Sequence, residues 1–362
     1  MAGAWPVGAA HVFVITRRAS EHHLNSQHTR VPFHDVVSRQ APRSARVFDA
    51  GALDDGSLVT LRCGARRAIV APNVGGSIAA FYDEGEEGAV HWLRPATRAA
   101  IDESDPLRMA SFPLMPYCNR IRDGRFTFDG QPFRLPTVTG EFGHALHGHA
   151  WRRPWQVGLS RPNELELHFR HDAARQTGAD VEPDASWPFS YEARQRLVLS
   201  DEGLSVRLWA RNLSAQPMPF GFGHHPYYPR PEGTRITTKV RAMWKADADL
   251  LPVSIGAHPA VDALAEGMLV DQFALDNNFA GWEREATIAW PGEKRCLTLR
   301  ADAPLDFFVL FSPANTPFFC AEPVSNTTDW LNSDASHGDV GGCVLAPGEV
   351  IEAGFAWVPG QL

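Results

Sequence analysis

Apolar and polar residues alternate in short stretches along most of the chain, which is typical of β-strands that bury one face and expose the other. The stretch 164–170, ELELHFR, has an apolar side chain at every second position, and the stretch 204–208 repeats the pattern. Two shorter stretches, 58–62 and 68–71, also predict strands, and the sequence NVGGS that follows them predicts a loop.

Two stretches predict strands of a more specific kind. Between residues 125 and 135, apolar residues alternate with polar ones on both sides of the pair Asp129-Gly130. An Asp-Gly pair in that setting favours a tight hairpin turn, because glycine adopts positive φ without steric cost. The stretch 305–311 is almost continuously apolar, so we expect a strand that is buried on both faces.

The fold class follows from these strands and from what separates them. The chain has 30 glycines and 28 prolines, and almost no stretch has the period of a long amphipathic helix. Strands do not alternate regularly with helices, and no exact repeat is present, which disfavours a parallel α/β fold and a propeller. We therefore expect an all-β protein, a large antiparallel sandwich or barrel.

The N-terminal region differs from the rest of the chain. Residues 1–46 contain six arginines and five histidines but two acidic residues, with one short apolar run. We expect residues 1–46 to be a poorly ordered extension, and we favour this over a transit peptide because no amphipathic helix stands out. Residues 47–362 contain no convincing linker, so we expect them to form one domain.

Composition narrows the function. The formal net charge is −8 and no extended run of lysine or arginine follows the N-terminal region, so neither nucleic acid nor an acidic membrane is an expected partner. The five cysteines form no CxxC pair, and no apolar segment is long enough to span a bilayer. We expect a cytoplasmic protein, a monomer or homodimer, that acts on a small or neutral molecule.

The stretch 221–229, GFGHHPYYP, is the first candidate for chemistry. Proline disfavours the helical region for the residue before it, so His225 should be extended, and Tyr227 offers a flat face and a hydroxyl to a ligand. The alternative, which has equal weight, is that His225 is a structural histidine buried at the end of a proline-rich strand. His224 stands beside His225, and the sequence leaves open which of the two acts.

Two segments before this one carry further polar residues. Asn119 and Arg120 follow a proline-shaped turn, where the guanidinium could donate two hydrogen bonds to vicinal hydroxyls, although a surface salt bridge is the ordinary role of an arginine. His147 and His149 would share one strand face and could suit a metal, but a third ligand at the usual spacing is missing. We therefore expect no metal site.

Two later segments contribute carboxylates. Asp276 lies between apolar residues in LDNNF, where a turn residue that caps its own backbone is the alternative. Glu322 follows an apolar run in FFCAEPV, and an unpaired buried charge there would be costly. Burial would also raise its pKa into a range useful for proton transfer.

Taken together and in order, these segments resemble the aldose 1-epimerase (galactose mutarotase) family over roughly residues 47–362. Each motif is short, and the ordered set is what carries the resemblance. The matching motifs are Asn119-Arg120-Ile121 with Gly124 and Phe126, Leu146-His147-Gly148, His225-Pro226-Tyr227, Asp276 with Phe279, Glu322 with Asn332, and the closing Leu345-Ala-Pro-Gly348-Glu349.

The resemblance implies the family's large antiparallel β-supersandwich and the interconversion of the α and β anomers of an aldose, without a cofactor. It assigns His225 as acid and Glu322 as base, places His147 and Arg120 beside the ring oxygen, and gives hydroxyl contacts to Asp276 and Asn119. We expect His225 to be cationic near neutrality, since an unperturbed imidazole titrates near ~6.5. A glutamine that contacts sugar in some members has no clear counterpart in 311–318.

Three other interpretations remain open from the sequence. A hexose-6-phosphate 1-epimerase of the same superfamily would need a cluster of basic residues around the pocket. A non-catalytic sugar-binding protein would not require an acid and a base. A glycoside hydrolase is disfavoured, because its usual mechanism needs two opposed carboxylates rather than a histidine and a glutamate.

Overall fold

A computed structural model of the chain describes residues 57–138, 143–173 and 187–362, and these residues belong to one compact unit. The predicted extension, residues 1–46, lies outside the described residues, as does its boundary with the predicted domain. That division of the chain stays a prediction.

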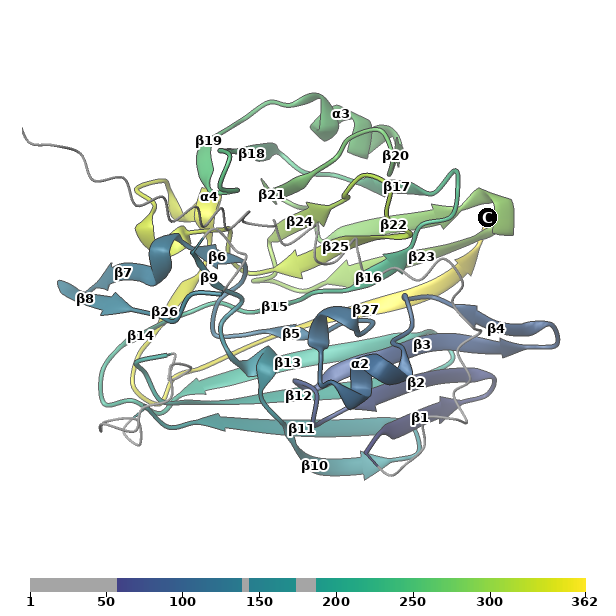
Figure 1. Cartoon of the computed structure of the whole chain (residues 1–362), viewed down its shortest axis with the longest axis horizontal. Helices are drawn as coiled ribbons and strands as arrows, with labels where there is room; N and C mark the ends of the chain where they lie inside the picture. The colour runs from purple at the N-terminus through teal and green to yellow at the C-terminus, as the bar shows by residue number, and fades with distance from the viewer. Residues whose placement is uncertain (1–56, 139–142, 174–186) are drawn as a thin grey trace, which may run out of the picture. The chain divides into compact units, whose positions relative to one another are not determined.

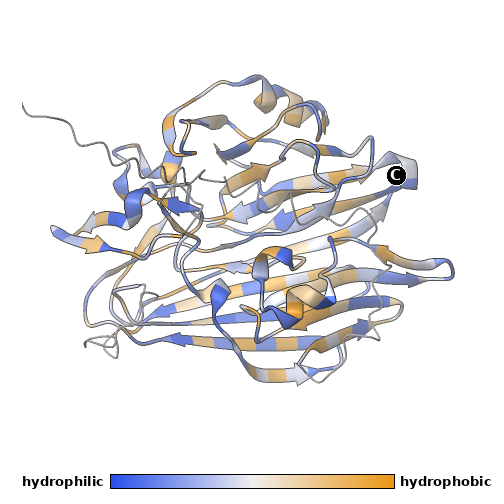
Figure 2. Ribbon diagram, in the orientation of Figure 1, coloured by the Kyte–Doolittle hydropathy of each residue, from blue (hydrophilic) through white to orange (hydrophobic). Residues whose placement is uncertain are grey.

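The largest element is an antiparallel sheet of nine strands (Figure 1). Its strands β11 and β13 show the alternation that the sequence predicted, visible as bands of opposite hydropathy along each arrow (Figure 2), and β12 between them alternates in the same way. The apolar positions face the core because successive side chains of a strand point to opposite faces. In sheet order the strands are β10 (Gln156–Arg161), β11 (Glu164–His171), β12 (Tyr191–Leu199), β13 (Leu204–Asn212), β27 (Val350–Gln361), β23 (Arg295–Ala301), β22 (Glu285–Trp290), β17 (Arg235–Thr238) and β20 (Met268–Leu269).

A second sheet of eight strands carries the segments that hold His225, Asp276 and Glu322. Every residue of its central strands β24 and β25 is buried, as the apolar stretch 305–311 predicted for the first of them. In order the strands are β19 (Pro252–Gly256), β18 (Ala242–Ala246), β21 (Asp276–Ala280), β24 (Phe307–Phe311), β25 (Phe318–Val324), β15 (Gly223–His224) and β5 (Pro113–Leu114), and β16 (Tyr227–Pro229) also pairs with β25.

Smaller sheets complete the fold. The predicted hairpin is confirmed: Asp129 and Gly130 have φ of 49° and 71°, and Phe126 stacks on Phe133 across the strand pair at 5.1 Å. The remaining strands are β1 (Val59–Cys63), β2 (Arg66–Ala71), β3 (Ser77–Gly85), β4 (Gly88–His91), β6 (Arg120–Ile121), β7 (Arg125–Phe128), β8 (Gln131–Arg134), β9 (Ala145–Leu146), β14 (Met218–Phe220) and β26 (Cys343–Leu345).

Helices are short in the described part of the chain. They are α2 (Arg98–Asp102), α3 (Pro259–Glu266) and α4 (His337–Val340), with single 3₁₀ turns between strands. The helix α3, which the sequence analysis did not predict, begins after His258, whose ring accepts a hydrogen bond from the Ala260 amide, and ends at Gly267 with φ 93°. The all-β, antiparallel prediction is confirmed.

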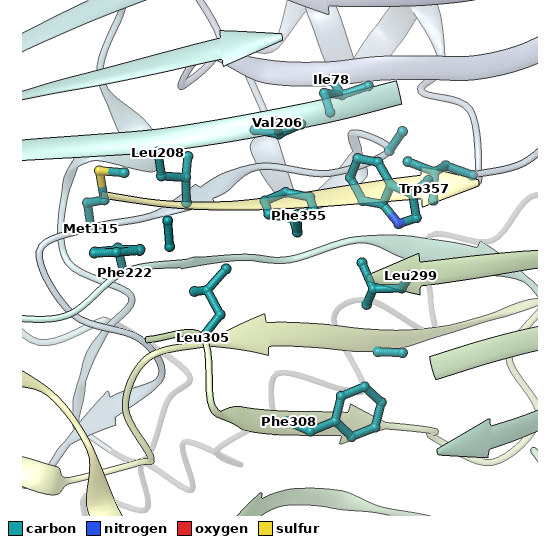
Figure 3. Close-up of a cluster of buried hydrophobic side chains, with 14 of the residues drawn as sticks. Ile78, Met115, Val206, Leu208, Phe222, Leu299, Leu305, Phe308, Phe355 and Trp357 are labelled. Carbon is teal, nitrogen blue, oxygen red and sulfur yellow. The ribbon is translucent and has the colours of Figure 1, made fainter. Parts of the chain in front are cut away.

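The two large sheets face each other across the main hydrophobic core (Figure 3). Phe355 and Trp357 of β27 pack against the ring of His224 of β15 in the other sheet, with ring centroids 5.2 and 6.2 Å apart. Burying each such side chain contributes about 1.5–3 kcal/mol. The indole of Trp357 also donates a hydrogen bond to the Tyr228 hydroxyl at 2.9 Å, which links β27 to β16. The core therefore fixes β15, β16 and β25, which carry the candidate residues.

Candidate active site

A small, partly open pocket lies beside the buried centre of the eight-stranded sheet. All of the predicted site residues except Tyr227 line it, although they come from segments far apart in the sequence. The lining residues are Asn119, Arg120, Leu146, His147, His225, Asp276, Phe311 and Glu322.

Glu322 lies in the middle of β25, opposite Val309 of β24, and its exposure is 2%. Its Oε2 has no hydrogen-bond partner among the described residues. Burial raises the pKa of this carboxyl well above its usual value, and the negative charge of Asp276 adds to that, while Arg120 opposes it. The carboxyl is therefore favoured in its protonated form, as the sequence analysis expected for a buried glutamate.

His225 follows β15 and points its Nε2 at Glu322, 3.3 Å from Oε1. Its ring stacks on Phe112 and on Tyr227, with ring centroids 4.8 Å apart in both pairs, so its orientation is fixed. Burial lowers the pKa of His225 to about 3, and the nearby charges of Arg94 and Arg120 act in the same direction. The expectation of a cationic His225 near neutrality was therefore wrong, because it assumed a solvated imidazole.

His224 faces the opposite side of the strand and contacts the core between the sheets. Its Nδ1 contacts the Ser111 hydroxyl, and its Nε2 lies 2.8 Å from Gln195 Oε1. The Gln195 amide nitrogen donates to the Gly76 carbonyl, so Oε1 is the acceptor and His224 Nε2 carries the proton. Both ring nitrogens are thus satisfied within the core, and the structure places His225, not His224, in the pocket.

Asn119 and His147 hold each other through two hydrogen bonds. The Asn119 amide donates to His147 Nδ1 at 3.0 Å, and the His147 amide donates to the Asn119 carbonyl at 2.9 Å. Both residues have left-handed backbone, with φ of 61° and 57°, a costly conformation that recurs at functional sites. Burial lowers the pKa of His147 well below its usual value. Since Nδ1 accepts, the neutral ring carries its proton on Nε2.

Arg120 connects the two sides of the pocket. Its Nη1 donates to Asn119 Oδ1 at 3.1 Å, and its Nη2 donates to Asp276 Oδ2 at 3.2 Å. The guanidinium is almost fully buried, whereas the Asp276 side chain is 17% exposed. This pair balances one positive with one negative charge, and it leaves Asp276 accessible to a ligand.

Tyr227 lies behind His225 rather than in the pocket wall. It is fully buried, and the guanidinium of Arg94 lies over its ring, 3.8 Å from the ring centroid. Arg94 in turn donates to the carbonyls of Leu107 and Met109 at 2.9 and 2.7 Å. Tyr227 is not among the residues that line the pocket, whereas His225, on which its ring stacks, is. Direct contact between Tyr227 and a substrate stays a prediction. Arg94 was not identified from the sequence.

Sequence reasoning also missed two apolar residues and one thiol at the site. Leu146 and Phe311 line the pocket, and Phe311 is the Cα partner of Asp276 across β21 and β24. Cys320, Glu322 and His225 form a buried group whose possible ligand atoms all lie within 4.8 Å of one another, close enough to hold a metal ion.

The histidine pair considered from the sequence is divided between two environments. His149 packs against His171 at 4.4 Å and against Tyr191, whereas His147 faces the pocket.

None of the helices in the described part of the chain is long and apolar enough to cross a membrane.

Fold and site together define a class of protein in which a buried histidine and glutamate share a polar pocket on an antiparallel β-sandwich. A family model described as Aldose 1-epimerase matches residues 57–356. The chain therefore belongs to the aldose 1-epimerase family.

Individual proteins are similar to the chain in sequence or in fold. The chain is 28% identical over 272 residues to the uncharacterized protein YphB of Escherichia coli, covering 71% of this chain and 84% of that protein. It is similar to the crystal structure of a putative aldose 1-epimerase from Escherichia coli K12, with TM-score 0.72 and 25% identity, covering 84% of this chain and 99% of the other. A galactose mutarotase-like protein from Clostridium acetobutylicum shares the fold, with TM-score 0.73 and 19% identity over 84% and 95% of the two chains.

Replacing His224 by asparagine is expected to destabilise the fold by about 1–3 kcal/mol, because Gln195 or Ser111 loses a buried partner. Denaturant unfolding of the variant and the parent measures this difference.

The free energy of unfolding of the parent should also fall in acid because of His224. Burial, with a smaller effect of His225, lowers the pKa of folded His224 to about 3, against about 6.5 when unfolded.

Protonation thus favours the unfolded chain, so the contribution of neutral His224 is full above pH ~6.5 and is lost as the pH falls from there toward about 3. Between about pH 8 and about pH 5, the parent should lose about 2 kcal/mol more stability than the variant. An equal loss in both proteins would show that His224 is not the titrating group.

Proposed function

We propose that the chain interconverts the α and β anomers of a neutral aldose, with Glu322 and His225 as the proton-transfer pair. The observation that carries this proposal is the 3.3 Å approach of His225 Nε2 to Glu322 Oε1 at the wall of a polar pocket. Opening a pyranose ring requires one proton to leave the anomeric hydroxyl and one to reach the ring oxygen. A neighbouring acid and base can perform both transfers.

The proposed cycle starts with a proton moving from Glu322 to His225 when sugar binds. The Glu322 carboxylate then takes the proton of the anomeric hydroxyl, and the C1–ring oxygen bond breaks as His225 protonates the ring oxygen. The open-chain aldehyde rotates about the C1–C2 bond. Closure on the other face of the carbonyl reverses both transfers and gives the other anomer.

The electrostatics of the site favour the ring-opened state. When the ring opens, Glu322 becomes protonated and His225 becomes neutral, which are the forms that burial prefers for each group. The charged pair exists only while the closed sugar is bound, when sugar hydroxyls can solvate it. The pair thus returns to its starting form once per turnover without exchanging protons with bulk water.

The remaining lining residues suit the positioning of hydroxyl groups. His147, neutral with its proton on Nε2, can donate to a sugar oxygen, and Asp276 can accept from a sugar hydroxyl. Arg120, held between Asn119 and Asp276, supplies donors whose direction is fixed. We assign these residues to substrate binding, and Tyr227 to holding the His225 ring.

Neutral aldoses should be preferred over sugar phosphates. Among the described residues that line the pocket, Arg120 is the only cation, and Asp276 already neutralises it. A phosphate dianion would meet two carboxyl groups there without an added positive charge. We expect kcat/KM for the better of galactose and glucose to exceed that for glucose 6-phosphate by at least about tenfold, or about 1.4 kcal/mol.

Polarimetry with freshly dissolved α-galactose, α-glucose and glucose 6-phosphate tests both the activity and the preference. The rate of approach to equilibrium is compared with the spontaneous rate in the same buffer. A tenfold preference for the phosphate ester would support a hexose-6-phosphate epimerase instead. Sugar binding without any acceleration across a panel of aldoses would support a non-catalytic sugar-binding protein.

A further inference from the structure

We propose that His225, Cys320 and Glu322 form a binding site for one thiophilic divalent cation of the zinc type, and that the bound ion blocks proton transfer. The metal site stands on its own geometry, whereas the inhibition rests on the proposed function. The site shares His225 and Glu322 with the pocket.

The backbone brings the three ligands together. Cys320 and Glu322 are two residues apart on β25, so their side chains share one face of the strand. The Cα partner of Cys320 across the sheet is Tyr227, whose ring stacks on His225. All three ligands are buried, with exposures of 0%, 2% and 4% for Cys320, Glu322 and His225.

One ligand–ligand distance already matches that around a tetrahedral zinc ion, and the other two lie within 4.8 Å. Zinc lies about 2.0–2.2 Å from nitrogen and oxygen ligands and about 2.3 Å from sulfur, which places the ligand atoms about 3.3–3.6 Å from one another. His225 Nε2 and Glu322 Oε1 already lie 3.3 Å apart, and no pair of the three ligand atoms is separated by more than 4.8 Å. Small side-chain movements would close the site.

The donor set selects the kind of metal. One thiolate, one imidazole and one carboxylate suit zinc and related soft or borderline ions, whereas magnesium and calcium prefer oxygen ligands alone. Glu322 Oε2 has no hydrogen-bond partner among the described residues, so coordination would satisfy an otherwise costly buried group. The fourth coordination position would face the pocket, open to water or to a sugar hydroxyl.

Binding balances both protons and charge. The incoming M²⁺ ion displaces the Cys320 thiol proton and the Glu322 carboxyl proton, and these two protons leave to solvent. The resulting site holds two anionic ligands, the Cys320 thiolate and the Glu322 carboxylate, and one dication. Binding therefore adds no net charge to the interior. The bound ion is coordinated by the imidazole nitrogen of His225 and the carboxylate of Glu322. Neither group can then exchange a proton with the sugar.

The guanidinium groups of Arg94 and Arg120 face this group and oppose cation binding. Arg94 is turned toward the carbonyls of Leu107 and Met109, and Arg120 toward Asp276, so both positive charges have local partners. These charges reduce affinity for every dication equally, and the selectivity for zinc over magnesium comes from the ligands themselves.

The test is zinc titration of the full chain, stripped of metal, in competition with a chromophoric chelator, with magnesium as the comparison ion. The variants are Cys320→Ser and Cys320→Ala, and the control is Cys343→Ser, a half-buried thiol that donates to the Phe220 carbonyl. We expect one tight zinc per parent chain, at least ~10-fold weaker binding in both Cys320 variants, and unchanged binding in the control. Having two replacements at position 320 keeps the test valid if one of them does not fold.

Mutarotation is then measured with and without zinc, each protein being compared with its own zinc-free rate. We expect zinc to inhibit the parent and the Cys343 variant but not the Cys320 variants. Zinc binding that is unchanged by both Cys320 replacements, or that is no tighter than magnesium binding, would overturn the site. Chelator competition needs no turnover, so loss of the tight zinc in Cys320 variants of a protein without mutarotation would support the metal site and refute the proposed function.

Discussion

Replacing Glu322 by glutamine is expected to lower kcat for mutarotation by about 10²–10⁴-fold, or about 2.7–5.4 kcal/mol in activation free energy, with KM changed only a few-fold. Glutamine has the size of the protonated carboxyl, the form that burial favours, so the fold and the pocket should be kept. It cannot take the proton of the anomeric hydroxyl. A loss in kcat without a matching rise in KM is the result expected when an interaction acts only in the transition state.

The matched control is Glu283→Gln, the same chemical change at an exposed carboxylate that pairs with Lys239 at 3.5 Å. It should leave both kinetic constants and the unfolding midpoint close to those of the parent. Polarimetry over a range of sugar concentrations gives kcat and KM for both variants. Full activity in the Glu322 variant would refute the proposed mechanism, whatever the control shows.

Replacing His225 by asparagine should have a loss of similar size, about 10²–10⁴-fold in kcat. Asparagine keeps a polar side chain toward Glu322 but cannot deliver a proton to the ring oxygen. The stacked contacts with Phe112 and Tyr227 are lost as well, so some loss of stability is expected and is measured by denaturant unfolding. Sugar binding, followed by calorimetry, should remain within a few-fold.

His224→Asn separates position from chemistry, because the same substitution is made one residue away. It should reduce stability, as argued from its contacts with Ser111 and Gln195, while its kcat stays within a few-fold of the parent at a pH where both proteins are folded. Loss of activity in the His224 variant, with His225→Asn within a few-fold of the parent, would show that the acid was assigned to the wrong histidine.

The strands could be predicted because local sequence controls them directly. The alternation in β11 and β13, the continuous apolar run of β24 and the Asp129-Gly130 turn each depend on residues within one short segment. The helix α3 was missed because its eight residues are too few for a helical period to stand out. The order in which strands join two sheets was not predictable, since β27 pairs with β13 and β23, which are far from it in the chain.

The site was predictable as a set of residues but not as an arrangement. Ordered motifs indicated Asn119, Arg120, His147, Asp276 and the His225–Glu322 pair, and the fold brings all of them to one pocket. Tyr227 was also predicted to contact the substrate, yet only His225 of the two lines the pocket, because a histidine and a tyrosine two residues apart do not reveal from sequence which ring lies in front. Arg94 and Cys320 were missed because each belongs to an ordinary apolar segment.

The sequence by itself thus determined the fold class, the family and the residue types available for acid–base chemistry, since strand periodicity and ordered motifs are properties of the chain. Tertiary structure alone decided which of two adjacent histidines enters the pocket. Neighbouring side chains of an extended segment point to opposite faces, and distant partners at Gln195 and Glu322 fix which face is which. It also decided the protonation of the pair, because burial in the folded protein, not composition, raises the pKa of Glu322 and lowers that of His225.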